Sequence, residues 1–463
     1  MGDLLQDILL LSSAPGFEAR LDTLRSTIVS AARLAGYDSK ENQTVVTILR
    51  EVAEQGDDAV SRYTEKFDGV KLRPDQFRVT REALEEAHGT IDARLLESLR
   101  KAIRNVRAYQ EKIFIGDRQE FSQGTGIRYT PLKRVGVCVP GAAAPLPSTV
   151  IMTVVPAQVA GVKEIAVVSP PRYRVGVQNE GQDVQSAIRN PQSAIATIHP
   201  VILAVCHELK VEEVYRLGGV QAVGAMAHGT QTIAKVDKIV GPGNKWVQAA
   251  KKNVAGDYVG IDSIAGPSEV LILASKEANP AWVAADMLSQ AEHGTDSSAI
   301  VLTDSQPLAG AILAQLRDQL NALPRAAEAA QSLARFSRII VVKDMDKAID
   351  LANEFACEHL EIQCGAGSRR VAERITNAGA IFIGPNTPVA VGDYWAGPSH
   401  TLPTGIRAKF SSALTCNDFL KSISLIEYSA EQLAASADDI VRLAEVEGLD
   451  AHARSVKVRR QQQ

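Results

Sequence analysis

The 463-residue sequence has no long apolar stretch: none approaches the roughly 20 residues that a membrane-spanning helix needs. The apolar run Ile8–Leu11 near the start is far too short for the core of a secretion signal, and no lysine or arginine precedes it. We therefore expect a cytoplasmic protein with no membrane partner.

The sequence also has no CxxC pair, and its five cysteines are scattered. An odd number without that spacing favours free thiols in a reducing compartment over a disulfide framework or a cysteine-based zinc site. The ligands of any bound metal are then expected to be His, Gln or carboxylate side chains. The cysteines are Cys138, Cys206, Cys357, Cys364 and Cys416.

A strongly basic segment is absent as well, since no lysine- or arginine-rich run precedes the short tail with Lys457, Arg459 and Arg460. The net charge is −4, whereas a nucleic-acid-binding domain needs a basic face. We interpret the tail as a solvated chain end and expect no nucleic-acid partner. A composition that is 45% hydrophobic and 22% charged indicates a large core, and the length predicts two or three domains.

From Arg134 onward, short apolar segments alternate with helix-like ones, a pattern typical of parallel sheets covered on both faces. It predicts an α/β fold with two doubly wound, incomplete Rossmann-like domains. The first run of predicted strands is Val135–Val139, Glu164–Ser169, Glu213–Leu217 and Lys238–Val240. The second run is Val270–Ala274, Ser298–Leu302, Ser337–Val342, Leu360–Cys364 and Ala380–Ile383.

Helical periodicity and capping residues mark several further elements, and a short strand is expected at Phe77–Thr80. Between Arg172 and His199 the pattern lapses, and the tetrapeptide at Gln185–Ile188 recurs at Gln192–Ile195, which indicates a surface insertion. Ser429 and Gln432 form a capping box for a helix ending near Gly448, with a short turn to follow at Asp450–His452. The other predicted helices are Arg81–His88, Ala93–Lys112, Pro280–His293 and Met345–Phe355.

Gln290 and His293 are the first candidate site residues. They are three positions apart near the end of the predicted helix Pro280–His293, so they share one face. Such a pair can hold a metal, although Gln is an uncommon zinc ligand. The alternative is a polar helix end at which a protonated His favours the helix dipole.

Glu358 and His359 are adjacent at the junction between a predicted helix and a predicted strand. An imidazole titrates near neutrality and suits proton transfer, so the pair is a candidate acid–base group. An incidental pair at an exposed turn is the alternative. A third candidate is the loop Gly392–Thr404, in which glycines and prolines bracket Asp393 and His400 directly after a strand, since α/β proteins bind ligands at the carboxyl ends of strands.

Two glycine- and proline-rich loops and one C-terminal segment complete the candidates. Gly241–Lys245 follows a predicted strand and can present backbone amides to an anion, and Gly266–Glu269 precedes another strand. No GxGxxG turn follows the first strand, so a dinucleotide here is not held by that motif. Glu447–His452, taken alone, indicates only a helix end and a turn.

Taken in order, these segments resemble histidinol dehydrogenase, over most of the chain from about Val135 to Val456. Each string is modest alone, but the series is very specific. The matching strings are Gly241–Val247, Ala265–Leu271, Leu288–Gly294, Glu358–Leu360 and Gly392–Thr404, with His452 near the end.

The resemblance implies one Zn²⁺ per active site, with Gln290, His293, Asp393 and His452 as ligands. It also implies a homodimer in which the partner subunit supplies His452 and Glu447 through an exchanged C-terminal tail. The implied substrate contacts are the four ligands together with Ser268, His359, His400 and Glu447. The implied NAD contacts are Gln221, Asn244 and Cys138.

The implied reaction is the oxidation of L-histidinol to L-histidine through L-histidinaldehyde, the last steps of histidine biosynthesis, with two NAD reduced in turn. His359 is the implied base for the hydroxyl proton, and Glu358 activates the water that adds to the aldehyde. Zinc is expected mainly to orient the amino and imidazole nitrogens of the substrate.

Four positions depart from the usual pattern of the family: Cys138 for Tyr, Val389 for Glu, Cys357 for Pro and Ser399 for Asn. They leave room for a paralogue that oxidises another small diol or amino alcohol, such as a sulfopropanediol. A zinc hydrolase that uses no nicotinamide, with Glu358 activating water, and a non-enzymatic binding protein are the alternatives from other classes.

The expected domain limits combine the strand pattern with this resemblance. They are 1–25 for an N-terminal helical arm, 26–133 with 245–385 for the larger α/β domain, 134–244 for the second Rossmann-like domain with its insertion at about 172–199, and 386–463 for the active-site loop and a helical dimerisation tail exchanged with the partner subunit.

Overall fold

The computed structural model describes residues 5, 7–34, 36, 38–116, 119–141, 145–174, 196–324 and 326–460. Its larger sheet has six parallel strands in the order β1-β13-β12-β11-β14-β15. These strands are β1 (Leu9–Leu11), β11 (Glu269–Ala274), β12 (Ser298–Thr303), β13 (Arg338–Val341), β14 (His359–Gln363) and β15 (Ala380–Ile383).

The second sheet has five parallel strands in the order β10-β9-β4-β5-β8. They are β4 (Arg134–Cys138), β5 (Glu164–Val168), β8 (Glu213–Tyr215), β9 (Lys238–Val240) and β10 (Gly260–Ile261). The five strands of the smaller sheet can be numbered 1 to 5 along the chain from β4, and those of the larger sheet 1 to 5 from β11, with β1 left out at the edge. Both sheets then have the spatial order 3-2-1-4-5, which is the doubly wound arrangement. The predicted fold class is thereby confirmed, and all nine predicted strands of the two runs are present to within two residues at each end.

Helices cover both faces of the larger sheet. One face packs on α11 (Pro280–Ala291), α12 (Gln306–Leu320) and α13 (Ala326–Phe336) through an apolar core. The other face packs on α1 (Phe17–Ala32), α14 (Met345–Phe355) and α15 (Ser368–Ala372). Residues 1–25 are expected to form an N-terminal helical arm. In the structure, β1 pairs with β13, and α1 buries Leu21 and Leu24 in the core of the larger sheet.

The second sheet is covered by helices from two separate stretches of the chain. One face packs on α4 (Arg81–Thr90), α5 (Ala93–Ile113), α6 (Pro147–Val159) and α8 (Pro200–Glu208). The other packs on α2 (Lys40–Gln55), α3 (Asp57–Asp68), α9 (Gly219–His228) and α10 (Lys245–Val254). The expected grouping of 26–133 with 245–385 therefore differs from the observed packing, because α2–α5 and α10 bury their apolar faces against the smaller sheet. Domain limits as such stay a prediction.

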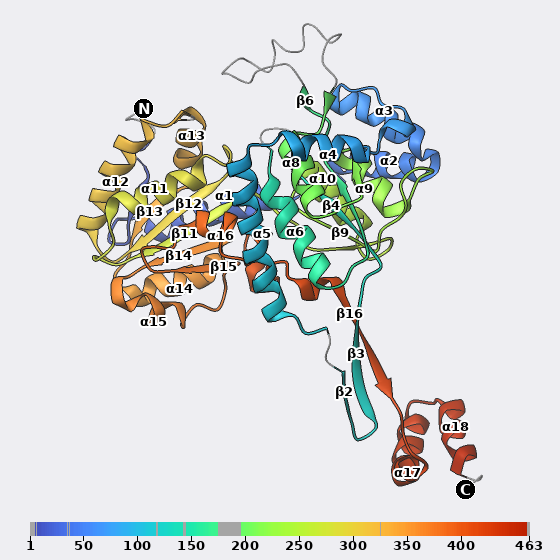
Figure 1. Cartoon of the computed structure of the whole chain (residues 1–463). Helices are drawn as coiled ribbons and strands as arrows, with labels where there is room; N and C mark the ends of the chain where they lie inside the picture. Colours follow the sequence, from blue (N-terminus) through green and yellow to red (C-terminus); the bar gives the residue numbers. More distant parts are fainter. Residues whose placement is uncertain are drawn as a thin grey trace.

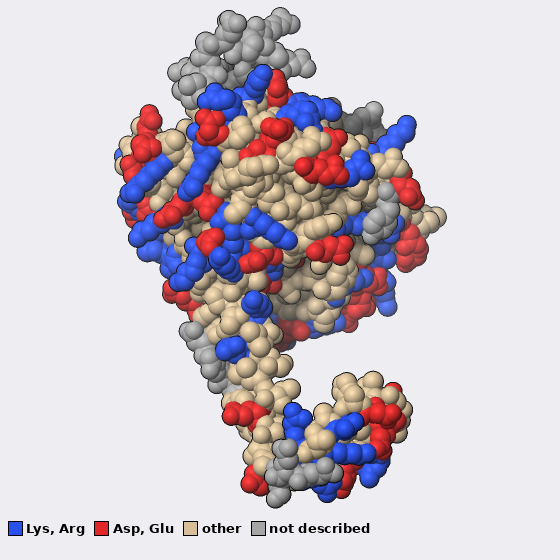
Figure 2. Space-filling view, turned by 90° about the vertical axis from the view of Figure 1, so that its right-hand side faces the viewer, with Lys and Arg blue, Asp and Glu red and all other residues tan. Residues whose placement is uncertain are grey.

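A long antiparallel ribbon leaves the body of the molecule (Figure 1). It consists of β2 (Gln119–Ser122), β3 (Thr125–Pro131) and β16 (Leu420–Ile426), with β3 in the middle. Helices α17 (Ala430–Val446) and α18 (Asp450–Arg460) lie at its tip, and Figures 1 and 2 both show them separated from the two sheets. The capping box at Ser429 and Gln432 is confirmed, whereas α18 is longer than the expected turn.

The remaining elements are short. They are β6 (Tyr173–Arg174), β7 (Ala196–Thr197), α16 (Val389–Tyr394) and the 3₁₀ turns η2 (Pro74–Gln76), η3 (Gly365–Gly367), η4 (Arg407–Lys409) and η5 (Cys416–Phe419). The strand expected at Phe77–Thr80 is reduced to a single bridge between Arg78 and Tyr215. The repeated tetrapeptide at 185–188 and 192–195 lies outside the described residues.

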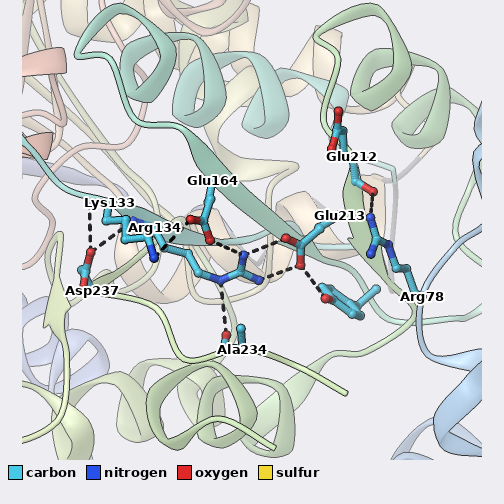
Figure 3. Close-up of polar contacts among 9 residues, drawn as sticks. Arg78, Lys133, Arg134, Glu164, Glu212, Glu213, Ala234 and Asp237 are labelled. Atoms are coloured by element: carbon cyan, nitrogen blue, oxygen red, sulfur yellow. Dashed lines mark hydrogen bonds and ion pairs between the residues drawn. The ribbon is translucent and has the colours of Figure 1, made fainter. Parts of the chain in front are cut away.

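Arg134 at the start of β4 forms the centre of a charge cluster that ties the amino ends of β4, β5 and β8 together (Figure 3). Its guanidinium donates to both carboxylate oxygens of Glu213, at 2.7 and 2.6 Å, and to Glu164 at 3.1 Å. The Arg134 side chain is only 7% exposed, and the pairing raises its pKa further, so it is always charged. The cluster lies at the end of the sheet opposite to the cavity described below and is structural.

Figure 2 shows basic and acidic side chains interspersed on the visible face, without a continuous basic patch. Within the described ranges, no helix combines the length and the apolar character needed to cross a bilayer.

Candidate active site

The site begins where β11 pairs with β14. In this pairing Val270 lies opposite His359, so Glu269 and Glu358 meet at the amino ends of the two strands. The backbone N–H of Glu269 donates to the Glu358 carboxylate at 2.9 Å, and Ser268 also hydrogen-bonds to that carboxylate. His359 Nδ1 lies 3.0 Å from the carbonyl oxygen of Glu269. Because a carbonyl only accepts, Nδ1 carries the proton and Nε2 carries the lone pair.

Glu358 and Glu269 are two buried carboxyl groups next to each other. Burial raises the pKa of Glu358 to about 8, and it raises the pKa of Glu269 to about 8 with a further contribution from the charge of Glu358. The Glu269 carboxylate also accepts from the N–H of Gly405 at 2.9 Å. Two such groups beside an imidazole can hold or pass a proton near neutral pH. Glu269 was not singled out from the sequence, although it belongs to one of the matching strings.

His359 is buried, and its Nε2 has no hydrogen-bond partner. This nitrogen lies 3.8 Å from a carboxylate oxygen of Asp393, near the end of α16. Burial lowers the pKa of His359, and the partial opposing effect of Asp393 is smaller, so the ring is a neutral base. Burial raises the pKa of Asp393, while His359 and His293 act in the opposite direction. The structure therefore brings Glu358, His359, Asp393 and His293 into one electrostatic group.

Gln290 is the least satisfied side chain of the site. It is 1% exposed, and both its amide oxygen and its amide nitrogen lack a hydrogen-bond partner. Helix α11 ends at Ala291, so His293 lies just beyond it rather than in its last turn. His293 Nδ1 lies 2.9 Å from the carbonyl oxygen of Ser289, which leaves Nε2 with a free lone pair. A metal ligand His is commonly oriented in this way.

A polar network below these residues joins the three elements that carry them. Gln363 on β14 donates to Asp286 on α11 at 2.8 Å and to Glu361 at 3.2 Å. Glu361 accepts from the N–H of Val389, the first residue of α16, at 2.9 Å. Burial and the charge of Asp286 raise the pKa of Glu361 to about 9, so one proton is retained by the pair. The network fixes β14, α11 and α16 relative to one another.

The position of this cluster in its sheet corrects the expectation from the sequence. Asp393 and its loop were expected at the carboxyl ends of the strands, but Ser268 and Glu358 precede β11 and β14, at their amino ends. Helix α11 runs back across the sheet after β11, and its last turn therefore returns Gln290 to the amino edge. Asp393 near the end of α16 reaches the same edge, beside His359.

A cavity of about 890 Å³ lies at the carboxyl ends of the smaller sheet and reaches the cluster. Its walls include Cys138 at the end of β4, Gln221 on α9 and Asn244 at the start of α10 on one side, and His293 and Tyr394 on the other. Gln221 is fully buried, and both its amide atoms lack partners. The cavity therefore brings the three predicted cofactor residues close to the metal candidates, at the strand-order switch between β4 and β9.

The glycine loop after β9 is held by a buried ion pair. The N–H of Gly241 donates to Asp262 at 2.7 Å, and Lys251 contacts both Asp262 and the carbonyl oxygen of Gly241. Gly241 has φ of +104°, and a Cβ there would lie 2.3 Å from the carbonyl oxygen of Cys138. Asn244 then caps α10 through its side-chain oxygen, which accepts from Trp246 and Val247. Burial raises the pKa of Cys138 to about 12, so its thiol stays protonated.

Two other residues that differ from the family pattern, Cys357 and Ser399, are hydrogen-bonded within the structure. The Cys357 thiol donates to the carbonyl oxygen of His359 at 3.3 Å, and Ser399 donates to the carbonyl oxygen of Met152 at 3.0 Å. Burial lowers the pKa of His400 to about 4, with smaller effects from His359 and His293, which places this neutral ring near the cluster.

Glu447 and His452 are not brought to this cluster within one chain. Both are exposed, at the end of α17 and on α18, and these helices lie apart from the sheets (Figures 1 and 2). Across the part of the chain that the structure describes, no group of three or more His, Cys, Asp and Glu side chains is spaced to hold a metal ion. Within one chain His293 acts on Asp393 electrostatically and Gln290 lies one turn before His293, but the fourth predicted ligand, His452, is not brought near them.

Comparisons with known proteins find similarity to one family over most of the chain. The family model for histidinol dehydrogenase matches residues 32–460. The chain is 44% identical over 421 residues to histidinol dehydrogenase of Rhodopirellula baltica, covering 90% of this chain and 86% of that protein. It is 42% identical over 446 residues to the Geobacillus kaustophilus enzyme, covering 95% and 99%. The crystal structure of histidinol dehydrogenase from Elizabethkingia anophelis superposes with a TM-score of 0.84 at 34% identity, covering 96% of both chains.

The buried carboxyl pair predicts a pH-dependent stability. Because the pKa of Glu269 is about 8 in the folded chain, above its ordinary value of 4.5, its proton stabilises the fold fully below about pH 4.5, and this stability is lost as the pH rises toward 8. Replacing Glu269→Gln removes that loss. We expect the variant to gain stability relative to the unsubstituted protein between pH 5 and 8, by up to about 1.4 kcal/mol per pH unit.

Urea unfolding of both proteins at pH 5, 6.5 and 8, without metal or nucleotide, measures this difference. Glu82→Gln, at an exposed position on α4, is the control and should show no such trend. A constant difference between the Glu269→Gln and unsubstituted proteins across the three pH values would contradict the assignment.

Proposed function

The chain belongs to the histidinol dehydrogenase family of oxidoreductases, and from this premise we propose that it oxidises L-histidinol to L-histidine through L-histidinaldehyde, with one Zn²⁺ per site and two NAD reduced in turn. The observation that carries the proposal is the buried pair Glu358–His359 together with the buried Gln290, whose amide oxygen and nitrogen have no hydrogen-bond partner. The cavity that reaches this cluster supports a dinucleotide as the second reactant.

The donor set fits a zinc ion. A buried amide oxygen without a partner at Gln290, a free Nε2 at His293 and the carboxylate of Asp393 are nitrogen and oxygen donors of the kind that Zn²⁺ accepts. The fourth ligand in the proposal is His452 of the partner subunit. When bound, the ion supplies Lewis acidity and holds the amino and imidazole nitrogens of histidinol in place.

The surface of the ribbon and tail supports a dimer that exchanges its C-termini. Large apolar side chains there are exposed on a single chain, among them Ile426 at 76%, Leu443 at 67% and Val446 at 83%. Exposed apolar groups in this number favour burial against another protein surface. A second copy that covers them would also carry Glu447 and His452 to the site of its neighbour.

We place NAD in the cavity at the carboxyl ends of the smaller sheet. The partnerless amide of Gln221 and the N-cap residue Asn244 support this position, and the glycine at position 241 permits close packing of the loop on Cys138. When bound there, NAD would supply the hydride acceptor for the oxidation. We also propose that the protein works in the reducing cytoplasm, and its five free, buried cysteines support this location.

His359 is the base in this proposal. Its Nδ1 proton is held by the carbonyl oxygen of Glu269, so Nε2 is oriented to accept the hydroxyl proton of histidinol in the step that forms the aldehyde. A depressed pKa keeps the ring neutral before the step. Asp393, 3.8 Å from Nε2, then stabilises the positive charge that the ring acquires.

Glu358 acts in the second half of the proposed reaction, in which the aldehyde is oxidised to the acid. As the carboxylate, it takes a proton from the water that adds to the aldehyde carbon. His359, protonated in the first step, returns its proton to the aldehyde oxygen, so the product is the hydrated aldehyde and the ring is again neutral. His359 again removes a hydroxyl proton as the second hydride leaves, and the acid is formed. A pKa of about 8 suits a group that must first accept this proton and later release it.

The direct test is the yield of NADH on limiting L-histidinol. Two NADH per histidinol are expected, because the aldehyde is oxidised on the same site. Removal of the metal with a chelator should abolish turnover, and added Zn²⁺ should restore it. A yield of one, or turnover without a change in absorbance at about 340 nm as a hydrolase would give, contradicts the proposal.

Replacing His359→Asn separates the base from the ligands. We expect a loss of about 100- to 10,000-fold in kcat with zinc retained at one ion per site, because the residue is assigned to proton transfer. His293→Ala serves as the comparison and should lose zinc. Metal analysis of both purified variants measures this, and zinc loss in His359→Asn would show that the assignment is wrong.

Mixing His293→Ala subunits with His452→Ala subunits tests the shared site. Each variant alone should be inactive, whereas every mixed dimer contains one intact site, so about a quarter of the activity per subunit should return after random exchange at equal amounts. Native mass spectrometry confirms the mixing. Mixed dimers without activity would indicate that His452 serves its own chain.

A further inference from the structure

Asp68, the last residue of α3, lies in the wall of the large cavity and has no role in the chemistry described above. Its side chain is only 4% exposed. Arg172 donates from Nε to one carboxylate oxygen of Asp68 at 2.8 Å and from Nη2 to the carbonyl oxygen of Phe67 at 3.2 Å. The second carboxylate oxygen, Oδ2, is buried and has no hydrogen-bond partner.

Arg172 accounts for one oxygen of this carboxylate, but the fold does not account for the other. The C-terminal end of a helix carries partial negative charge, so an Asp there is unfavourable. Burial raises the pKa of Asp68 despite the opposing effect of Arg172, which indicates a net penalty for its charge. Gly69, with φ of +68°, already ends the helix by donating its N–H to the backbone carbonyl oxygen of Glu65. A buried acid that local structure does not need points to a ligand.

The position of Asp68 in the cavity indicates which part of a dinucleotide it meets. The reacting end must lie near His293 and Tyr394, which border the Glu358–His359 cluster. Asp68 lines the same cavity from α3, which lies well apart from α11 in Figure 1. A dinucleotide with its nicotinamide at the cluster therefore extends its adenosine half toward Asp68 and Arg172.

We propose that Asp68 determines the cofactor specificity: its free oxygen accepts a hydrogen bond from a ribose hydroxyl of the adenosine half of NAD and excludes a dinucleotide with a 2′-phosphate. The inference rests on the proposed function, since it needs NAD in the cavity. A carboxylate is a strong acceptor for a ribose diol and repels a phosphate, whereas an arginine attracts one. Asp68 holds Arg172 in an ion pair and so keeps it from serving a phosphate.

The test compares NAD and NADP binding and turnover in the unsubstituted enzyme, Asp68→Ala and the double variant Asp68→Ala/Arg172→Ala, each as the zinc-loaded full-length chain. For Asp68→Ala we expect the preference for NAD over NADP to fall on the order of 10- to 100-fold, because a hydrogen bond to a charged group is lost. The loss with NAD is expected mainly as a higher KM for NAD, because the proposed contact lies at the adenosine half and away from the reacting atoms. In Asp68→Ala the guanidinium of Arg172 is freed and can attract the 2′-phosphate of NADP, so turnover with NADP should rise. The double variant lacks this guanidinium and should not show the rise.

Glu65→Ala is the matched control, because Glu65 is an exposed acid on the same helix and its removal changes the net charge equally. An unchanged preference in Asp68→Ala, or an equal change in Glu65→Ala, overturns the inference. Asp68→Asn provides a second variant that keeps the shape and loses the charge. Calorimetric titration with NAD and NADP separates the two proposals. Dinucleotide binding that depends on Asp68, without turnover of histidinol, contradicts the proposed function alone. Turnover of histidinol with a cofactor preference that does not depend on Asp68 contradicts only this inference.

Discussion

The register between β11 and β14 is the constraint on which the site depends. Because Val270 lies opposite His359, the backbone of Glu269 can donate to Glu358 and accept from His359 at the same time. A slip by one residue would turn His359 to the opposite face, where Leu360 and Ile362 pack in an apolar core. The tautomer of the base, the position of the acid and the pairing of two central strands are therefore one property of the fold.

The two sheets have the same strand order and contribute opposite edges to the site. The smaller sheet contributes its carboxyl ends, where short loops after β4 and β9 leave a cavity at the strand-order switch. The larger sheet contributes its amino ends, which the returning helices α11 and α16 supply with side chains. The cavity proposed for NAD and the cluster around Glu358 and His359 are thus built on two sheets of one topology.

The sequence predicts the strands and most helices because each has a local signal, such as β-branched runs or the capping box at Ser429. It does not predict where helices pack: α2–α5 cover the smaller sheet, and β1 joins the larger one, because these contacts connect residues far apart along the chain. The antiparallel ribbon was missed since its strands are half exposed and weakly patterned. One available signal was overlooked, namely the alternation His359, Glu361, Gln363 in a wholly buried strand, which marks a polar face inside the core.

Spacing and position in the sequence indicate Gln290, His293, Glu358, His359 and Asp393 as candidates, and the resemblance to a family supplies their roles. The physical reason for these residues is visible only in three dimensions. Across the described residues, Gln221 and Gln290 are the two buried glutamines whose amide oxygen and nitrogen both lack partners. A buried polar group left unpaired costs about 1–3 kcal/mol, so a leucine of similar size would suit either position better if packing alone mattered. Gln221 lies on α9 in the wall of the cavity, and Gln290 lies near the end of α11, which packs on the other sheet. Side chains with neither polar atom paired are suited to a bound ligand, and the NAD and Zn²⁺ of the proposed function would supply a hydrogen-bonding group and an electrophile to them.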